Sequence, residues 1–359
     1  MEQRLVGILL NAAAHRGIPR GKTGWESLAC YEEAAAAYGL TPCYLKLSDI
    51  NPGSGYSIAY IKGPRGYKRM AVPIPQAIHN RAIYPPGNAG TERLAACGVK
   101  VFNRCSRYGK DEIHRLLELD SELRQHLPDT EAGNEGLKRM MERHSDLILK
   151  PRRGSVGKGV MRLRREDKES WALDYLHNGQ MITANIDPSR LPFPLLDRID
   201  AESYLIQERI PLAEADGRPF DLRVTVQRGW GGEWAVTGLF AKLAPRGGFV
   251  SNIARGGEAA EAALALEQAF SSRAAAHYRM SASWLALAVA RCLERSLPGL
   301  ADIGLDIAIT QDGQLYFIEC NGRDQRYGFY KAGLPEIWKE SYRRPMGYAR
   351  YLLDGGGMQ

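Results

Sequence analysis

The sequence lacks most of the features that mark secreted, membrane-spanning or metal-cluster proteins. Its six cysteines are scattered, without a Cys-x-x-Cys pair or the spacing of a zinc site, which favours a reduced, cytoplasmic protein over a disulfide-stabilised one. None of the seven histidines stands in a His-x-His or His-x-x-x-His pattern. No apolar run approaches the roughly 20 residues that a membrane span needs, and the run at residues 6–10 is too short for a signal peptide. We therefore expect a cytoplasmic protein without a membrane span.

Charge and composition limit the classes of partner. The chain has 359 residues, 44% hydrophobic and 25% charged, as in ordinary globular proteins with room for two or three lobes. A surplus of 48 basic over 41 acidic residues gives a net charge of +7, which fits an anionic ligand as well as nucleic acid or an anionic surface. A mildly basic surface without any partner is the simpler alternative. Since no RNA- or DNA-binding motif is present, we expect no specific nucleic-acid partner.

Alternating strand and helix patterns in the first hundred residues predict a small open α/β domain. A loop with Gly21 and Lys22 follows the first strand, and it either contacts a ligand or simply connects two elements. We expect strands at residues 5–10, 43–47, 56–61, 67–72 and 99–102, with helices at residues 25–38 and 91–97. Further on, we expect helices at residues 111–119, 135–143 and 258–297, a strand at 146–150, and mostly strands from there to about residue 243.

A basic, glycine-rich segment joins two predicted strands near residue 155. Glycines allow backbone N–H groups to wrap around an anion, and here they are accompanied by four basic side chains. The glycines are Gly154, Gly157 and Gly159, and the basic residues are Lys150, Arg152, Arg153 and Lys158. The pattern is neither GxxxxGK[ST] nor a GxGxxG that opens a helix. We expect a β-hairpin lid that binds phosphate; a basic surface hairpin is the alternative.

Two later strands end or alternate in polar residues. Residues 203–210 form an apolar strand that turns polar at Gln207 and Glu208, where a purine and a ribose could be held. In residues 220–227 every second side chain is polar, so Arg223 lies on a polar face as a rigid clamp for phosphate or carboxylate. The partner strand at residues 234–243 contributes Lys242. Exposed polar strand ends and a cross-strand Asp–Arg salt bridge are the simpler alternatives.

A loop at residues 246–257 carries two Gly-Gly pairs that flank Asn252 and Arg255. This composition suits a mobile loop that closes over a reaction centre. A plain flexible loop could carry the same two side chains by chance.

Residues 303–321 predict a β-hairpin that pairs two carboxylates. Asp312-Gly313 between two apolar runs favours a two-residue type I′ turn. That register places Asp306 opposite Glu319, with Asn321 on the same face, and such oxygen ligands suit Mg²⁺. The opposite face is predicted to be core and consists of Leu305, Ile307, Ile309, Tyr316 and Ile318. A solvated acidic face is the alternative.

The segment after this hairpin is basic and aromatic. Arg323 and Arg326 could receive a substrate carboxylate, while Tyr327 and Tyr330 could pack on its organic part. A surface segment that merely caps the last sheet is the equal alternative.

Taken in order, these motifs resemble the ATP-grasp superfamily, and most closely its YheC/YheD group of endospore coat-associated proteins. The resemblance covers about residues 99–330. Its elements are a helix-starting Lys110, Lys150 with its glycine loop, Gln207-Glu208, Asp221-x-Arg223, the Ser251-Asn252 loop with Arg255, and Asp306 followed by Glu319-x-Asn321.

The resemblance implies a mixed α/β and α+β fold of three parts that clamp ATP. These are a pre-ATP-grasp α/β domain at residues 1–104, a central lobe with the lid at 105–204, and a C-terminal lobe with the metal site at 205–352. It also implies ATP and one or two Mg²⁺ ions as cofactors.

The same resemblance implies roles for individual residues. ATP would be held by Lys110, Lys150, Gly154, Ser155, Gly157, Gly159, Gln207, Glu208 and Ile210. Magnesium would be bound by Asp306, Glu319 and Asn321, while Arg223, Arg255, Lys242 and Asn252 would act at the reaction centre.

The implied activity is that of a carboxylate–amine ligase that forms an acyl phosphate from an amino acid, peptide or related acid. A kinase that phosphorylates a hydroxyl and a non-catalytic, ATP-binding component of the spore coat are the alternatives. The expected partners are small-molecule or peptide carboxylates and amines, and such ligases often assemble as homo-oligomers. Association with the spore coat follows from the resemblance alone.

Overall fold

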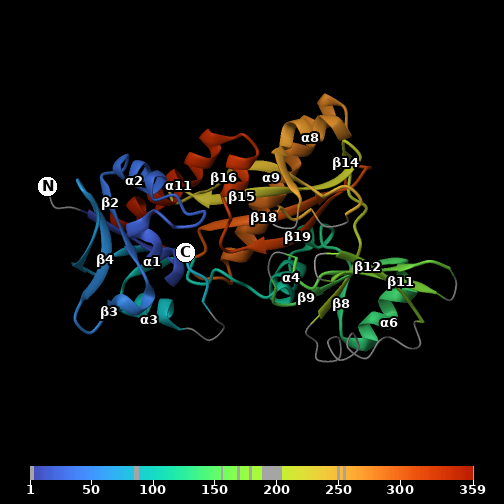
Figure 1. Ribbon diagram of the computed structural model, residues 1–359, viewed down its shortest axis with the longest axis horizontal. Coiled ribbons are helices and arrows are strands. Elements are labelled where there is room, and N and C mark those ends of the chain that lie inside the picture. Colours follow the sequence, from blue (N-terminus) through green and yellow to red (C-terminus); the bar gives the residue numbers. More distant parts are fainter. Residues whose placement is uncertain are drawn as a thin grey trace.

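Three β-sheets with surrounding helices make up the protein in the computed structural model (Figure 1). The structure describes residues 4–84, 89–154, 157–167, 170–177, 180–187, 204–248, 251–253 and 256–358. Figure 1 places the first sheet at one end of the molecule, and the second and third sheets face each other at the other end.

The first sheet has the strand order β3-β4-β2-β1-β6-β7, with β5 paired to β4. β1 runs parallel to β2 and β6, and β6 runs parallel to β7, as in an open α/β sheet. The strands are β1 (Arg4–Leu9), β2 (Leu40–Leu45), β3 (Ile50–Asn51), β4 (Tyr56–Gly63), β5 (Gly66–Pro73), β6 (Ala77–Asn80) and β7 (Lys100–Phe102). The helices of this region are α1 (Ala12–Gly17), α2 (Leu28–Ala36) and α3 (Gly90–Ala96). The sequence prediction missed β6 and began the first long helix too early.

The N-terminus of α2 explains that second difference. The Ser27 side chain accepts a hydrogen bond from the backbone N–H of Cys30, which makes Ser27 the N-cap. Trp25, which the prediction placed inside the helix, therefore lies in the preceding loop and is 60% exposed.

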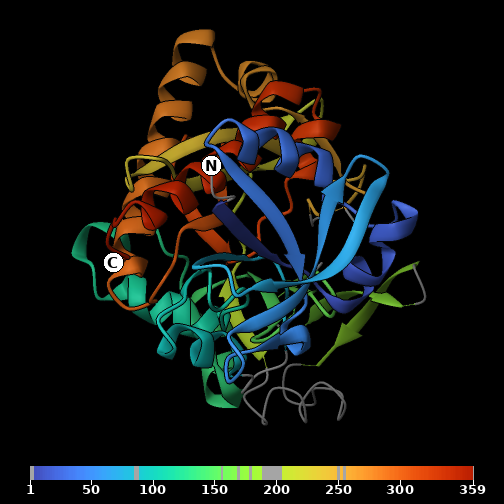
Figure 2. The same cartoon turned by 90° about the vertical axis from the view of Figure 1, so that its left-hand side faces the viewer.

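The last helix, α11 (Pro335–Leu353), returns to the first sheet and completes its core. Tyr342, Met346 and Leu352 of α11 pack with Tyr31 of α2 and Phe102 of β7, all of them buried. Figure 2 shows the red helix beside the blue N-terminal elements. The C-terminal helix α11 thus packs against the N-terminal elements of the chain.

The second sheet is antiparallel throughout and has the order β12-β11-β10-β9-β13-β8. Leu137 and Met140 of α6 pack onto one face of it. The strands are β8 (Thr130–Ala132), β9 (Asp146–Pro151), β10 (Met161–Arg165), β11 (Trp171–His177), β12 (Gln180–Ile186) and β13 (Tyr204–Glu208). The nearby helices are α4 (Lys110–Glu118), α5 (Ser121–Arg124) and α6 (Gly133–Arg143).

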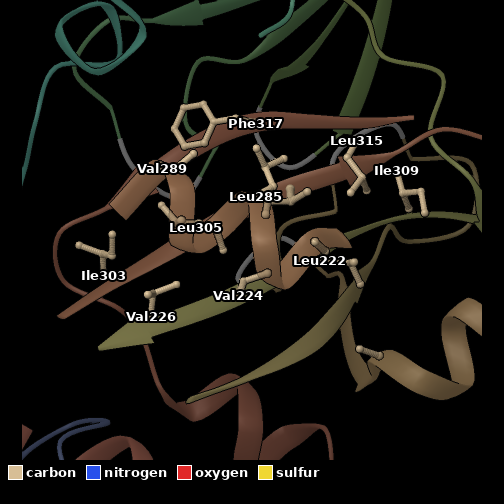
Figure 3. Packing of buried hydrophobic residues seen from close by; sticks show 14 of the residues in the cluster. Leu222, Val224, Val226, Leu285, Val289, Ile303, Leu305, Ile309, Leu315 and Phe317 are labelled. Atoms are coloured by element: carbon tan, nitrogen blue, oxygen red, sulfur yellow. The ribbon is translucent and has the colours of Figure 1, made fainter. Parts of the chain in front are cut away.

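The third sheet has the order β17-β16-β15-β18-β19, with the short β14 paired to β15. Its strands are β14 (Glu214–Ala215), β15 (Arg218–Arg228), β16 (Trp234–Leu243), β17 (Glu258–Glu261), β18 (Asp302–Ile309) and β19 (Leu315–Asn321). The helices are α8 (Ala262–Ala269), α9 (Ser272–Glu294) and α10 (Tyr327–Lys331). Figure 3 shows Leu285 and Val289 of α9 against Val224 of β15 and Leu305 of β18. Each such buried side chain contributes roughly 1.5–3 kcal/mol.

The single helix predicted for residues 258–297 is instead a strand and two helices. Residues 258–261 pair with β16, and the chain breaks again between α8 and α9. There the Ser271 side chain accepts a hydrogen bond from the N–H of Ala274 and caps the new helix.

The hairpin of β18 and β19 has a different turn from the predicted one. The N–H of Thr310 donates to the carbonyl of Gln314, and the N–H of Gly313 donates to the carbonyl of Thr310, both at 2.9 Å. Gln311, Asp312 and Gly313 therefore form a three-residue loop. Gly313 has a φ of 86°, as the last position of such a loop requires.

A β-bulge then restores the predicted register at the carboxylates. Ile307 lies opposite Phe317, but Asp306 lies opposite Glu319, so Ile318 is the extra residue on β19. The longer loop and the bulge each shift the register by one residue in opposite directions. The prediction that Asp306 faces Glu319 is confirmed, although its geometric basis was wrong.

The same shift exchanges the two faces of β19. Leu315 and Phe317 are buried in the core, whereas the prediction placed Tyr316 and Ile318 there. Tyr316 is only partly buried and its hydroxyl donates to Gln314. The core positions predicted on β18 are confirmed, since Leu305, Ile307 and Ile309 are fully buried.

Within the described ranges, no helix is long and apolar enough to cross a membrane.

Candidate functional site

A cavity between the second and third sheets gathers most of the predicted site residues. Its lining from the prediction comprises Lys110, Lys150, Gly154, Gly157, Gln207, Glu208, Ile210, Lys242, Asn252, Asp306 and Glu319. Arg223, Gly159 and Asn321 are not part of this lining, and Ser155 and Arg255 lie outside the described residues. Segments more than 200 residues apart therefore meet in one place.

The two opposed carboxylates are each paired with cations. The Nε of Arg223 donates to Asp306 Oδ1 at 2.6 Å, and the Nζ of Lys242 lies 2.9 Å from Asp306 Oδ2. The Nζ of Lys110 donates to Glu319 Oε1 at 2.6 Å. Burial by itself would raise the pKa of Asp306, but Arg223 and Lys242 lower it to about 2. Asp306 is therefore ionised at neutral pH.

The donor set fits a hard divalent cation. Asp306 and Glu319 face each other on β18 and β19, and Asn321, two residues after Glu319, carries an amide oxygen. The described residues contain no group of three or more His, Cys, Asp or Glu side chains arranged to hold a metal. Magnesium is commonly held by one or two carboxylates together with waters and substrate phosphates. A site of two carboxylates and an amide matches that mode.

Lys150 is held at the centre of the cavity by β13. Its Nζ donates to Gln207 Oε1 at 2.8 Å, and Gln207 Nε2 donates to the hydroxyl of Thr130 at 2.8 Å. Burial and the nearby charge of Lys110 lower the pKa of Lys150 to about 8. In this arrangement the side-chain amide of Gln207 orients Lys150 and contacts Thr130 instead of facing a purine.

Apolar side chains form a slot beside these charges. The slot is lined by Ile148, Val160, Ile210, Leu212 and Ile318. Sequence analysis found only Ile210, because hydrophobic residues in strands carry no mark that separates a ligand slot from a core. A flat heterocycle fits such a surface, with the polar groups at its edge fixing its orientation.

Glu208 lies at the same end of the cavity, where its Oε1 accepts a hydrogen bond of 2.8 Å from the backbone N–H of Asp129. That bond fixes the carboxylate, whose other oxygen lies 3.7 Å from His144 Nδ1.

The glycine-rich turn owes its shape to two left-handed residues. Gly157 and Gly159 have φ values of 63° and 79°, which side-chain-bearing residues rarely adopt. A Cβ at Gly159 would also lie 2.8 Å from the Tyr204 hydroxyl. Lys158 lines the cavity, whereas Arg152 is paired with Asp111 at the start of α4.

Two further carboxylates complete the charge arrangement. Asp221 Oδ2 lies 3.0 Å from Lys242 Nζ, and Asp324 Oδ1 accepts from Arg223 Nη1 at 2.9 Å. Asp324 Oδ2 also accepts from the Thr225 hydroxyl at 2.5 Å. Arg223 is thus fixed between two carboxylates, which raise its pKa although burial opposes this. Asp324 has no sequence signal of its own, and only the fold reveals its place.

The structure assigns Arg326 to the interior instead of to a substrate lip. Arg326 is 2% exposed, its Nη2 donates to Asp302 at 2.5 Å, and its guanidinium lies 4.5 Å from the ring centre of Tyr342. Its charge is used inside the protein, so Arg326 is unavailable to a substrate carboxylate.

Comparison with known protein families identifies relatives over most of the chain. The sequence profile of the family described as YheC/D like ATP-grasp matches residues 98–352. Endospore coat-associated protein YheD from Bacillus subtilis (strain 168) is 26% identical over 306 residues, which cover 80% of this chain and 65% of YheD. Endospore coat-associated protein YheC from the same organism is 22% identical over 307 residues, covering 78% of this chain and 79% of YheC. The chain therefore spans about two thirds of the length of YheD.

Solved structures share the fold at low sequence identity. ATP-grasp ligase PsnB, complexed with a phosphomimetic variant of minimal precursor, Mg and ADP, aligns with a TM-score of 0.53 at 15% identity, covering 99% of both chains. VanG D-Ala:D-Ser ligase from Enterococcus faecalis aligns with a TM-score of 0.52 at 10% identity, covering 97% of this chain and 100% of VanG. The predicted ATP-grasp fold, with mixed α/β structure in three sheets, is confirmed.

Proposed function

This chain belongs to the YheC/D-like ATP-grasp family, and we propose that it is an ATP- and Mg²⁺-dependent carboxylate–amine ligase that works through an acyl phosphate. The observation that carries the proposal is a cavity lined by three lysines and two opposed carboxylates, with an arginine bound to one of those carboxylates. The cations are Lys110, Lys150, Arg223 and Lys242, and they come from α4, β9, β15 and β16.

Phosphoryl transfer needs positioning and charge stabilisation more than it needs covalent chemistry. Lys110 and Lys150 would bind the phosphates of ATP, and the apolar slot with Glu208 would hold adenine and ribose. Asp306, Glu319 and Asn321 would hold Mg²⁺, which when bound neutralises phosphate charge and aligns the phosphates. Arg223 and Lys242 would stabilise the negative charge that develops during transfer.

The reaction balances in two steps. A carboxylate oxygen of the substrate attacks the γ-phosphorus of ATP, and ADP leaves with the electron pair of the broken P–O bond. An amine then attacks the carbonyl carbon of the acyl phosphate, phosphate leaves, and the amine loses a proton. We place the substrate in the class of amino acids, peptides and related acids.

The names of YheD and YheC state an association with the endospore coat for those proteins. A purely structural role in such a coat would not require this site. Lys150 and Lys242 are buried and Lys110 and Arg223 are partly buried, and removing such charges from water is costly. A kinase shares the first step, so the nature of the acceptor separates it from a ligase.

Hydroxylamine trapping tests the proposal directly. The protein is incubated with Mg-ATP, hydroxylamine and pools of amino acids, dipeptides and small carboxylic acids. ADP together with a hydroxamate in one pool is the expected result, because hydroxylamine attacks an acyl phosphate but not a phosphate ester. ADP with a phosphorylated hydroxyl compound and no hydroxamate would contradict the ligase and establish the kinase.

Nucleotide affinity should fall as the pH rises through about 8. Lys150 is charged below its pKa of about 8 and neutral above it, and anionic phosphates bind the charged form. Above that pH the affinity for ADP should fall by up to about tenfold per pH unit, measured by calorimetry from pH 7 to 9.5. Lys150→Arg, which stays charged, should bind ADP with a flatter pH profile. An identical decline in both proteins would contradict the role of Lys150.

Asp324→Asn should lower kcat by about tenfold to a hundredfold with little change in KM for ATP. The substitution weakens the hydrogen bond from Arg223 Nη1 to residue 324 but leaves the apolar slot of the cavity unchanged. Steady-state kinetics measure the two constants separately, and Thr225→Val, which removes the other hydrogen bond to the Asp324 carboxylate, should show a smaller loss. A rise in KM alone would contradict this positioning role.

A further inference from the structure

A second concave region lies between the first sheet's loops and the segment that follows β19. It consists of two adjoining cavities of about 410 and 390 Å³, each within the range of small-ligand sites. Residues 23–26 line both cavities, so this loop forms their shared wall. None of the residues that line these cavities lines the cavity between the second and third sheets.

The first cavity is aromatic. Trp25 stacks on Tyr327 with ring centres 4.6 Å apart, and Lys331 Nζ lies 5.4 Å and 5.2 Å from those two rings. Tyr330 and Trp338 line the same cavity, and their ring centres are 5.3 Å apart. Trp25 and Tyr330 are each 60% exposed. Aromatic rings that are already ordered and still face solvent are typical of binding hot spots.

The second cavity is cationic. Its wall contains Lys22, Arg81 and Arg323, together with the single carboxylate of Glu26. Arg81 donates to Glu26 Oε1 through two nitrogens, at 3.1 and 3.0 Å, so that carboxylate is already neutralised. Arg323 Nη2 shares the same oxygen at 3.2 Å, and its buried Nε has no hydrogen-bond partner among the described residues. Lys22 and Arg323 therefore leave a surplus of positive charge.

Neighbouring residues of the chain link the second cavity to the Arg223 side chain. Arg323 directly precedes Asp324, the carboxylate that holds Arg223, and the Asp324 carbonyl accepts from Arg81 at 2.6 Å. Asp324 therefore binds Arg223 through its carboxylate and Arg81, in the wall of the second cavity, through its carbonyl.

We propose that the two cavities form the substrate cleft of the ligase, and that the substrate is an anionic amino acid derivative or short peptide with a bulky aromatic or apolar side chain. The inference rests on the proposed function for the direction of the substrate, but not for its binding. The side chain packs against Trp25 and Tyr330, and an anionic group remote from the reacting one binds Lys22 and Arg323. The reacting end points toward Arg223 and Lys242.

A binding selection tests the cleft without requiring turnover. The immobilised full-length chain, loaded with Mg-AMPPNP, is exposed to random synthetic tetrapeptides with free C-termini, and retained peptides are sequenced by mass spectrometry. Retained peptides should combine a bulky aromatic or apolar side chain with an acidic group. Their affinity, measured by calorimetry, should fall about tenfold or more in Trp25→Ala and in Arg323→Gln.

Matched controls come from α9, which lines neither cavity. Trp284→Ala and Arg279→Gln make the same two substitutions at exposed positions of α9 and should change peptide affinity less than about twofold. Equal losses of affinity in control and cleft variants would contradict the proposed substrate cleft but not the proposed ligase activity. The same conclusion would follow if a chain that binds AMPPNP retained no peptide. Peptide binding without ADP or hydroxamate formation would overturn the ligase and leave the cleft standing.

Discussion

Replacing Glu319 by alanine is expected to lower ADP formation from Mg-ATP by about a thousandfold or more while the protein stays folded. The substitution removes one of the two opposed carboxylates that we assign to Mg²⁺ and leaves Lys110 without its partner at 2.6 Å. The Glu319 side chain is 29% exposed and points away from the core. Its loss therefore creates no buried cavity, and thermal unfolding should remain close to that of the wild type.

The Mg²⁺ requirement distinguishes a metal ligand from a general defect. Glu319→Gln keeps the shape of the side chain but not its charge, so it should raise the Mg²⁺ concentration needed for half-maximal ADP formation. Asp312→Asn, in the loop of the same hairpin, serves as the control and should behave like the wild type. Full turnover by Glu319→Ala would remove the metal assignment.

This hairpin also shows how far the sequence alone can be interpreted. Alternating polar and apolar residues and the Asp-Gly pair predicted a hairpin with Asp306 opposite Glu319, and both are present. The turn type could not be predicted, because an Asp-Gly pair is compatible with both two-residue and three-residue loops. The bulge at Ile318 depends on the core, which buries Phe317. The sequence of the hairpin alone does not show which of these side chains the core buries.

The remaining differences have the same origin. The order of the polar and charged motifs resembled that of the ATP-grasp superfamily, and this resemblance indicated the fold and most of the cavity lining. Asp324, the apolar slot and the return of α11 to the first sheet all depend on contacts between distant segments. Arg326 shows an opposite error. The sequence suggested that it could bind a substrate carboxylate, but it is buried and donates to Asp302.

Asp302→Asn is expected to cause the largest loss of stability, lowering the free energy of unfolding by about 3–5 kcal/mol. Asp302 is fully buried at the start of β18 and accepts from Arg326 Nη2 at 2.5 Å, from Arg81 Nη1 at 3.4 Å and from Gln227 Nε2 at 2.8 Å. Burial would raise its pKa, but Arg326, His79 and Arg81 hold it well below the ordinary value. Asparagine preserves the shape and removes the charge. Arg326 then loses its bond to a charged carboxylate and keeps the hydrogen bond to the Tyr31 hydroxyl at 3.1 Å.

Urea unfolding at neutral pH measures this loss, and its pH dependence checks the cause. Because the folded pKa of Asp302 is depressed, its contribution is complete above the unfolded pKa and is lost as the pH falls below that value. The difference between wild type and Asp302→Asn should therefore shrink in acid. Asp216→Asn, which alters the exposed ion pair with Arg246, should change stability little. A loss in Asp302→Asn no greater than in this control would contradict the stability assigned to the buried Asp302 carboxylate and its partners.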